Sequence, residues 1–319
     1  MAGPFSPADR SLGEWPEKAL NPSPDSRNGT EFNMTKGSPE ADVRAISTLS
    51  LLPYLLITFG ITWGVLALFI FVPDTMVGLF GELTGQHPLF YLAVYAPAIA
   101  AVVIIGFASG FQELRRFLGR GLIWRCAPVW YAFLILGVPV MFYAGAALKG
   151  DLLSQPSPVS SASAVMVAVF FALIKGPVEE FGWRGFALPL LQRKMAPFWA
   201  ALLIGVIWGL WHTPAFLLSG TQQSAWAFTP FFAGTIGISV LMTALYNSSG
   251  GSVLLAALLH FQFMNPVWPD AQPYDTVFVL GSAAVVVWFC RESMFTGKDA
   301  VENVVPAAGN RPEKEGEPK

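Results

Sequence analysis

Charged residues are scarce in this chain, and their scarcity limits the class of protein it can be. Only 13% of the 319 residues are Asp, Glu, Lys or Arg, whereas 54% are hydrophobic and the mean hydropathy is +0.52. This balance excludes an ordinary soluble domain and favours a protein that crosses the membrane several times. The net charge of -2 offers no basic surface for a polyanion, so we expect no nucleic-acid partner.

A secretory signal peptide is also missing from the N-terminus. Such a peptide begins with basic residues and continues with an apolar run, whereas residues 1–45 contain Asp, Glu, Pro and Ser. We expect disordered cytosolic tails over residues 1–47 and 293–319, with a membrane domain over 48–292. The middle of the chain supports this division, because residues 46–290 hold only seventeen charged ones.

Apolar runs long enough to cross about 30 Å of hydrocarbon recur along the membrane domain. The expected fold is an all-α bundle of about eight transmembrane helices. The last three runs are short, which leaves a re-entrant segment and a total of seven spans open. The runs cover residues 50–72, 88–109, 127–148, 164–191, 197–218, 229–247, 252–268 and 274–290.

Basic residues predict the orientation, since cytoplasmic loops are enriched in Lys and Arg. They gather at 115–125, 193–194 and 291–298, after the second, fourth and last runs. We therefore expect both termini in the cytosol, at the plasma membrane of a prokaryote or the endoplasmic reticulum of a eukaryote. Cys126 and Cys290 lie near the same ends, where thiols stay reduced, so no disulfide is expected.

One embedded stretch, "VEEFGWRG" at 178–185, carries charge against this background. A charged side chain near the bilayer centre costs at least about 2.5–3.5 kcal/mol, so an embedded Glu pair indicates a functional site. On a helix Glu180 and Arg184 share a face, whereas Glu179 is rotated by about 100°. The pattern favours an ion pair between Glu180 and Arg184, with Glu179 free to take a proton. A purely structural salt-bridge cluster is the alternative.

Two of the three histidines lie in apolar runs and are candidates to act with the Glu pair. At about 1.5 Å per residue, Glu179, His212 and His260 lie about 18, 22 and 14 Å from the cytoplasmic ends of their runs. The three groups can therefore meet at one level of the bilayer. Lys175 lies one turn before Glu179 and either pairs with it or reaches a wet vestibule.

Three motifs, in this order along the chain, carry a resemblance to a known family. "EEFGWRG" (179–185), "WGLWH" (208–212) and "YNSSGGSVLLAALLHFQFMN" (246–265) are similar to successive motifs of the CPBP family. That family contains the CAAX-protease and bacteriocin-processing intramembrane proteases, including the type II CAAX prenyl endopeptidases. The resemblance covers roughly 170–268, and it implies an all-helical membrane peptidase whose polar cavity opens to the cytoplasmic side.

The resemblance also implies roles for individual residues. Glu179 and His212 would activate a water molecule for attack on a peptide carbonyl. Glu180 and Arg184 would support the site, and His260 would stabilise the oxyanion. These roles agree with the ion pair and the free carboxylate expected from the spacing of the charges.

One position departs from the family pattern. The family places Asn or Asp four residues after the last histidine, where this chain has Met264, and its asparagine is Asn265. A one-residue shift rotates a helical side chain by about 100°. Because Asn265 precedes Pro266, which disfavours the helical conformation, we expect the helix to end there and the Asn265 amide to turn back toward the cavity.

Zinc is the first alternative within the enzyme class. Glu179, His212 and His260 could supply three ligands, with water as the fourth. The chain has no HExxH motif, however, and few carboxylates to orient both histidines. We therefore favour a metal-free glutamate mechanism with no cofactor, and a metalloprotease is the alternative.

The favoured function is an intramembrane endopeptidase that acts on a peptide or protein substrate. It would remove the C-terminal tripeptide of prenylated CAAX proteins or process secreted peptides. The second hypothesis is a catalytically silent scaffold or a transporter that uses the same polar residues structurally. A transporter would distribute embedded charges over the two halves of an internal repeat, and the sequence shows no such repeat. The oligomeric state has no sequence signal.

Overall fold

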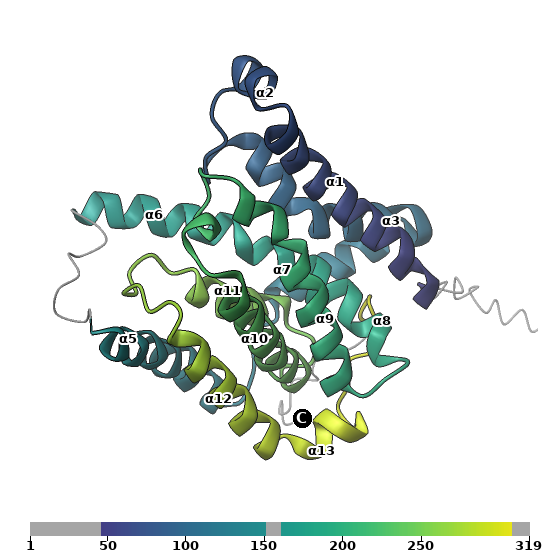
Figure 1. Ribbon diagram of the computed structural model, residues 1–319. Helices are drawn as coiled ribbons and strands as arrows, with labels where there is room; N and C mark the ends of the chain where they lie inside the picture. The colour runs from purple at the N-terminus through teal and green to yellow at the C-terminus, as the bar shows by residue number, and fades with distance from the viewer. Residues whose placement is uncertain (1–45, 151–160, 308–319) are drawn as a thin grey trace, which may run out of the picture. The chain divides into compact units, whose positions relative to one another are not determined.

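The computed structural model describes residues 46–150 and 161–307, and every regular element within these ranges is a helix (Figure 1). The all-α prediction is therefore confirmed. Residues 1–45 of the predicted N-terminal tail lie outside the described ranges. The α-helices are α1 (Leu51–Phe71), α2 (Pro73–Phe80), α3 (Pro88–Leu118), α4 (Pro128–Ala132), α5 (Val138–Lys149), α6 (Ala162–Ile174), α7 (Glu179–Gly182), α8 (Leu188–Gln192), α9 (Pro197–Trp211), α10 (Phe228–Ser248), α11 (Val253–Phe263), α12 (Asp275–Phe289) and α13 (Arg291–Thr296).

Every predicted apolar run contains helix, and six helical segments of the described chain are long and apolar enough to cross a membrane. These segments indicate an integral membrane protein. The remaining two runs form the shorter apolar helices α11 and α12. Eight spans therefore stays a prediction. The six long segments are Thr48–Phe71, Pro88–Leu122, Pro128–Lys149, Ala162–Gln192, Pro197–Leu217 and Phe228–Ser248.

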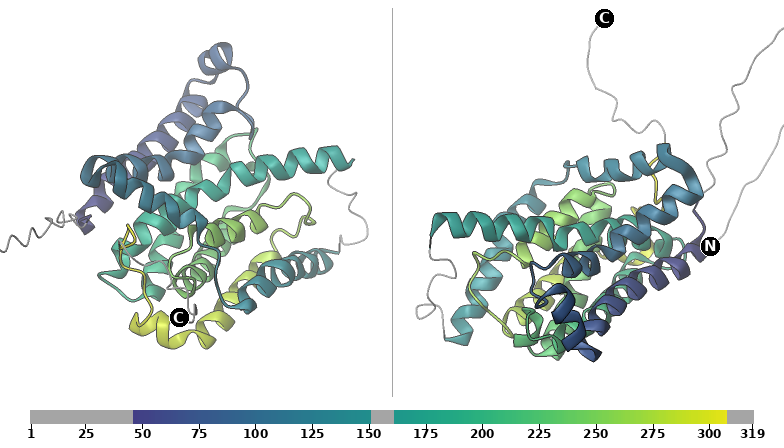
Figure 2. Two further views of the ribbon diagram at one scale, coloured as in Figure 1. Left: turned by 180° about the vertical axis from the view of Figure 1, so that it is seen from behind. Right: turned by 90° about the horizontal axis from the view of Figure 1, so that it is seen from above.

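Close helix contacts in the second half of the bundle depend on small residues. α10 packs against both α9 and α12 (Figures 1 and 2). A Cβ atom added to Gly205 of α9 would lie 2.7 Å from the Ile236 Cα of α10, so only glycine fits there. Ser239 of α10 donates a hydrogen bond to the Ala201 carbonyl of α9 at 2.8 Å. Small residues and interhelical hydrogen bonds of this kind hold membrane helices together.

A proline in α3 joins α1 to the helix that carries the Glu pair. Pro97 has no backbone N–H, so the Ala93 carbonyl one turn earlier is free to accept another hydrogen bond. Thr62 of α1 donates to that carbonyl at 2.7 Å. Gly182 of α7 packs so closely on Pro97 that an added Cβ would lie 2.5 Å from the Pro97 carbonyl carbon. These contacts hold α1, α3 and α7 together.

The segment after α13 packs against the end of the bundle. Arg120 is buried and donates to the main-chain carbonyls of Gly251 and Val304, each at 3.0 Å. Arg193 donates to the Glu302 carbonyl at 2.7 Å and to the Ile46 carbonyl at 2.6 Å. The basic connections predicted to face the cytosol therefore meet at one end of the bundle, together with both ends of the described chain.

The predicted start of the C-terminal tail at residue 293 was too early. Residues 293–296 complete α13, and the chain from 297 to 307 runs along the bundle with Val304 buried. Its backbone carbonyls are the acceptors for Arg120 and Arg193, and composition gives no sign of such contacts. Residues 308–319 lie outside the described ranges.

Candidate active site

The fourth predicted span is broken immediately before the Glu pair. α6 ends at Ile174, Lys175 has the non-helical dihedrals φ -93° and ψ -94°, and a short 3-10 turn covers Gly176–Val178. Pro177 in this turn has no N–H to continue a helical ladder. Irregular backbone at membrane depth is tolerated where it is buried in protein or lines a polar cavity. The break therefore places the start of α7 inside such an environment.

Gly176 allows α11 to approach this break. A Cβ atom added to Gly176 would lie 2.7 Å from Nε2 of His260, and it would also collide with the Met264 sulfur. His260 lies in the last turn of α11, and Met264 follows that helix directly. Any larger residue at position 176 would push the histidine away, so this glycine fixes where the His260 ring lies relative to the Glu pair.

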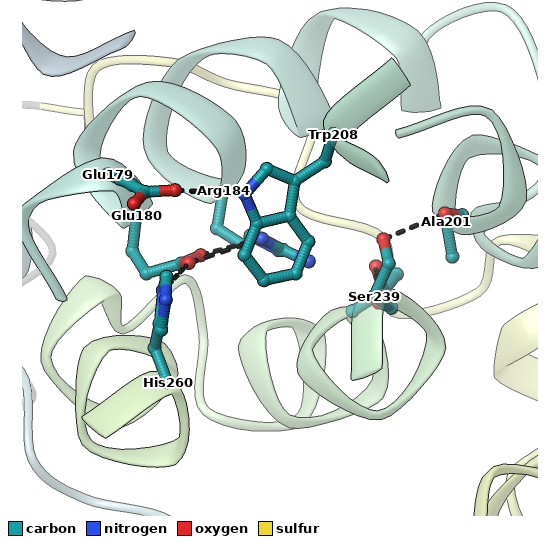
Figure 3. Close-up of polar contacts among 8 residues, drawn as sticks. Glu179, Glu180, Arg184, Ala201, Trp208, Ser239 and His260 are labelled. Atoms are coloured by element: carbon teal, nitrogen blue, oxygen red, sulfur yellow. Dashed lines mark hydrogen bonds and ion pairs between the residues drawn. The ribbon is translucent and has the colours of Figure 1, made fainter. Parts of the chain in front are cut away.

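Glu180 is the centre of a fully buried ionic cluster (Figure 3). Arg184 places Nη1 2.9 Å from one carboxylate oxygen and 3.2 Å from the other. His260 places Nδ1 2.7 Å from Glu180 Oε1, and because a carboxylate accepts, Nδ1 carries the proton. The ion pair predicted from the four-residue spacing is present, and His260 joins it from another helix.

Trp208 connects this cluster to Glu179. Its indole Nε1 donates to Glu179 Oε2 at 2.9 Å (Figure 3), and the Arg184 guanidinium lies 4.7 Å from the ring centroid. The edge of the same ring faces His260 at 5.2 Å between centroids. Among the described residues, the second carboxylate oxygen of Glu179 has no hydrogen-bond partner. That oxygen is free to accept a proton.

His212 lies one turn after Trp208 and touches the same indole. Its ring centroid is 5.7 Å from that of Trp208, and Nδ1 is 2.8 Å from the Trp208 carbonyl. A carbonyl only accepts, so the proton is on Nδ1 and the lone pair is on Nε2. Glu179 and His212 share no direct hydrogen bond in the described structure. Trp208 lies between them.

Trp211 holds the other side of His212 and is itself fixed by α1. The Trp211 and His212 rings lie 4.7 Å apart between centroids and are almost perpendicular. Trp211 Nε1 donates to Thr62 Oγ1 at 2.9 Å, and Thr62 in turn donates to the Ala93 carbonyl freed by Pro97. A chain of hydrogen bonds therefore runs from the kink in α3 to the neighbour of His212.

Asn265 is the predicted site residue that the structure does not bring to the others. α11 ends at Phe263, just before the turn that contains Pro266, as expected. The Asn265 amide then donates to the Gln262 side chain at 3.2 Å, and its oxygen accepts from the Val267 N–H at 3.1 Å. These contacts close a local turn, and among the described residues the Asn265 side chain has no hydrogen bond to the Glu pair or to either histidine.

Lys175 makes no ion pair with Glu179 in the described structure. Its ammonium lies over the Phe90 ring, 5.9 Å from the centroid, and beside Gly85 in the loop before α3. Of the two alternatives that the sequence left open, direct pairing with Glu179 is not what the structure shows. The side chain is partly buried and points toward that loop.

The sequence analysis did not assign Trp208 to the site, although the motif contains a signal for it. In "WGLWH" the first tryptophan is four residues before the histidine, so both lie on one helical face. Tryptophan is common as a packing residue in membrane helices, so its presence in the motif does not by itself indicate a hydrogen bond to a site residue. Only the three-dimensional contacts identify its N–H as a donor to Glu179.

The donors around Glu179 do not fit a zinc site in this arrangement. Within the described residues, no three His, Cys, Asp or Glu side chains form a group that could hold a metal ion. No step of the mechanism below therefore passes through a metal.

Comparison with known proteins shows a similarity over the part of the chain that contains this geometry. Residues 161–264 match the family model described as Type II CAAX prenyl endopeptidase Rce1-like. The match agrees with the resemblance to the CPBP family that the motifs indicated. The chain is also similar to CAAX prenyl protease 2 of Methanococcus maripaludis, with 27% identity over 138 residues. That alignment covers 40% of this chain and 51% of the relative, so the chain spans about half the length of the curated relative it matches.

The matched segment contains each residue of the cluster described above. It begins with α6 and ends at Met264, so it includes the Glu pair, Trp208 and both histidines and stops one residue before Asn265. The description of the matched family names an endopeptidase, and the relative is named as a protease.

Proposed function

We propose that this protein is an intramembrane endopeptidase whose attacking water is activated by Glu179 and His212. One observation carries the proposal: the Trp208 indole contacts Glu179, His212, His260 and Arg184 at once. A carboxylate with a free oxygen and an imidazole with a free Nε2 are thereby held around one ring. Such groups are suited to remove a proton from water.

The other members of the cluster would stabilise the charge that forms during the reaction. His260 binds Glu180 through Nδ1, which leaves Nε2 directed to the region of Gly176. When protonated, Nε2 can donate to the oxyanion, and Glu180 stabilises that imidazolium as a carboxylate does in other histidine sites. Arg184 supplies the counter-charge for Glu180, so the carboxylate keeps its place in a buried environment.

For the substrate, we propose the C-terminal part of a prenylated protein, from which the last three residues are removed. The matched family and the name of the relative both refer to CAAX prenyl substrates. A site within a membrane bundle suits a peptide whose cysteine carries a lipid, because the lipid keeps the scissile bond at the bilayer. Processing of secreted peptides is the alternative. The family resemblance implies that the cavity opens to the cytosolic side of the membrane, where such a substrate would enter.

The test is cleavage of a farnesylated CAAX peptide by the full chain in liposomes. Glu179→Gln removes the base at almost constant shape, and we expect cleavage to fall by about 10²- to 10⁴-fold. Glu82→Gln makes the same chemical change at an exposed loop residue and serves as the matched control. A Glu179→Gln variant as active as Glu82→Gln would refute the assigned role.

A chelator separates the two peptidase mechanisms in the same assay. Activity that survives the chelator supports the glutamate mechanism, whereas activity that is lost and then restored by zinc would establish a metalloprotease. If the folded wild type leaves the farnesylated peptide intact but cleaves an unprenylated peptide, the alternative substrate class is correct. A wild type that cleaves neither supports the silent scaffold or the transporter.

A further inference from the structure

Lys175 differs from the other embedded or buried cations near the Glu pair. Arg184 is paired with Glu180, and Arg120 is bound by main-chain carbonyls. Lys175, in contrast, has no ion pair and no hydrogen bond among the described residues, and its ammonium rests against the Phe90 ring. Lys175 lies within Ala162–Gln192, a segment apolar enough to cross a membrane, and a charge in such a segment without an anion indicates a functional role. An ammonium has three donors, and here they are available to an acceptor from outside the chain.

The position of Lys175 relates it directly to the reacting groups. It precedes Gly176, the residue packed against Nε2 of His260, and it lies within electrostatic reach of Glu179. Glu179 is four positions after Lys175, and the three residues between them form a 3-10 turn. At a rise of about 2.0 Å per residue, the two are about 8 Å apart along the chain.

Lys175 also lies on the side of Glu179 away from the basic end of the bundle. From the Glu pair, α8 runs toward Gln192, which contacts the Val301 carbonyl, and toward Arg193. In the opposite direction, Lys175 lies beside Gly85 in the loop before α3. A C-terminal peptide that enters from the basic end therefore reaches Glu179 first and Lys175 after it.

We propose that Lys175 binds the C-terminal carboxylate of the peptide substrate. This inference rests on the proposed function and names the feature of the substrate that the site recognises. Removal of a tripeptide leaves three residues beyond the scissile bond, and an extended chain spans about 3.3 Å per residue, or about 10 Å. The length of the tripeptide, about 10 Å, is close to the distance of about 8 Å along the chain between Glu179 and Lys175. The length of a lysine side chain can make up the difference. A carboxylate carried into a low-dielectric cavity requires such a counter-charge.

The test compares two prenylated peptides that differ only at the C-terminus, one a free acid and the other a carboxamide. The wild type should cleave the acid with a kcat/KM about 10- to 100-fold higher than the amide, as expected for a charge-assisted contact. In Lys175→Met this ratio should fall to about one, mainly through a higher KM for the acid. Lys175→Arg keeps the charge and should keep most of the preference.

The ratio of the two substrates separates binding of the carboxylate from other effects of Lys175. Loss of the ammonium also changes the charge near Glu179, but that change affects both peptides equally and cancels in the ratio. A Lys175→Met variant that retains the full preference for the acid would overturn the proposal, as would a wild type without any preference. Thermal unfolding of each variant in detergent shows whether the protein is folded.

Measuring peptide binding directly tests the carboxylate subsite without relying on catalysis. Acid and amide peptides with the scissile amide reduced to CH2–NH cannot be hydrolysed, and their affinities are measured on the wild type and on Lys175→Met. Tighter binding of the acid by the wild type alone supports the subsite even if no cleavage of any peptide is seen. Equal affinities for the two peptides on the wild type would overturn it, whether or not the protein is a peptidase.

Discussion

Replacement of Thr62 by valine tests how α1 supports the candidate site. Thr62 is 3% exposed, donates to the Ala93 carbonyl at 2.7 Å and accepts from the Trp211 indole at 2.9 Å. Valine has nearly the same shape as threonine, but its side chain can neither donate nor accept a hydrogen bond. The Trp211 N–H would lose its hydrogen-bond acceptor. The Ala93 carbonyl would lose its hydrogen-bond donor, and Pro97 supplies no helical N–H to replace it.

The expected size of the effect follows from these two hydrogen bonds. A buried group left unpaired costs about 1–3 kcal/mol in soluble proteins, whereas hydrogen bonds between membrane helices average about 0.6 kcal/mol. We therefore expect Thr62→Val to lower the free energy of unfolding by about 1–4 kcal/mol. Because the Trp211 ring contacts His212, a shift of that ring should also reduce kcat by about 10- to 100-fold under the proposed mechanism.

Two measurements on purified protein in detergent or liposomes check this prediction. Titration with a denaturing detergent gives the unfolding midpoint, and peptide cleavage gives kcat. Thr62→Ser keeps the hydroxyl and is the matched control, so it should remain close to the wild type in both. If Thr62→Val equals Thr62→Ser in unfolding and in kcat, the hydrogen-bond chain from Pro97 to Trp211 does not position His212, and this reasoning is wrong.

Three further changes address other parts of the structure. Arg184→Met leaves the buried Glu180 carboxylate without its cation, and unfolding should become easier by about 3–5 kcal/mol; an unfolding midpoint equal to that of the wild type would contradict a buried ion pair. Trp208→Phe keeps an aromatic ring but removes the donor to Glu179, so kcat should fall while the unfolding midpoint changes little; an unchanged kcat would remove Trp208 from the site. Burial raises the pKa of the Cys126 thiol, which lowers the thiolate fraction at neutral pH, so the midpoint of its maleimide reaction should lie at higher pH than that of a free cysteine peptide.

Local spacing predicted the part of the site that lies on one helix. The Glu180–Arg184 pair followed from positions four apart, and the helical runs followed from hydropathy. Counting residues from the helix ends also indicated that Glu179 and the two histidines lie at similar depth, and the structure places all three around one indole. The spacing of the charges and the depth of the three groups could be predicted because they depend on helix geometry alone.

The remaining features depend on contacts that leave no pattern in the sequence. The role of Trp208 depends on one N–H directed at Glu179, and tryptophan is common in membrane helices for other reasons. The segment from 297 to 307 is held through its backbone carbonyls, which every sequence possesses. Asn265 was expected to turn toward the cavity, but the turn at Pro266 offers it nearer partners.

The charges around the Glu pair balance in a way that suits an anionic substrate. Glu179 and Glu180 contribute two negative charges, and Lys175 and Arg184 contribute two positive ones, so the embedded group is neutral when both histidines are neutral. In the proposed reaction Glu179 loses its charge as it takes the proton from water, while the substrate carboxylate at Lys175 adds one. The net charge of the cluster is then that of the oxyanion, and the positive charge of a protonated His260, the form that donates to the oxyanion, brings it back to zero. Because isolated charges at membrane depth are costly, a cluster with cations on both sides of its carboxylates can bind an anion and move a proton without leaving any other charge unpaired.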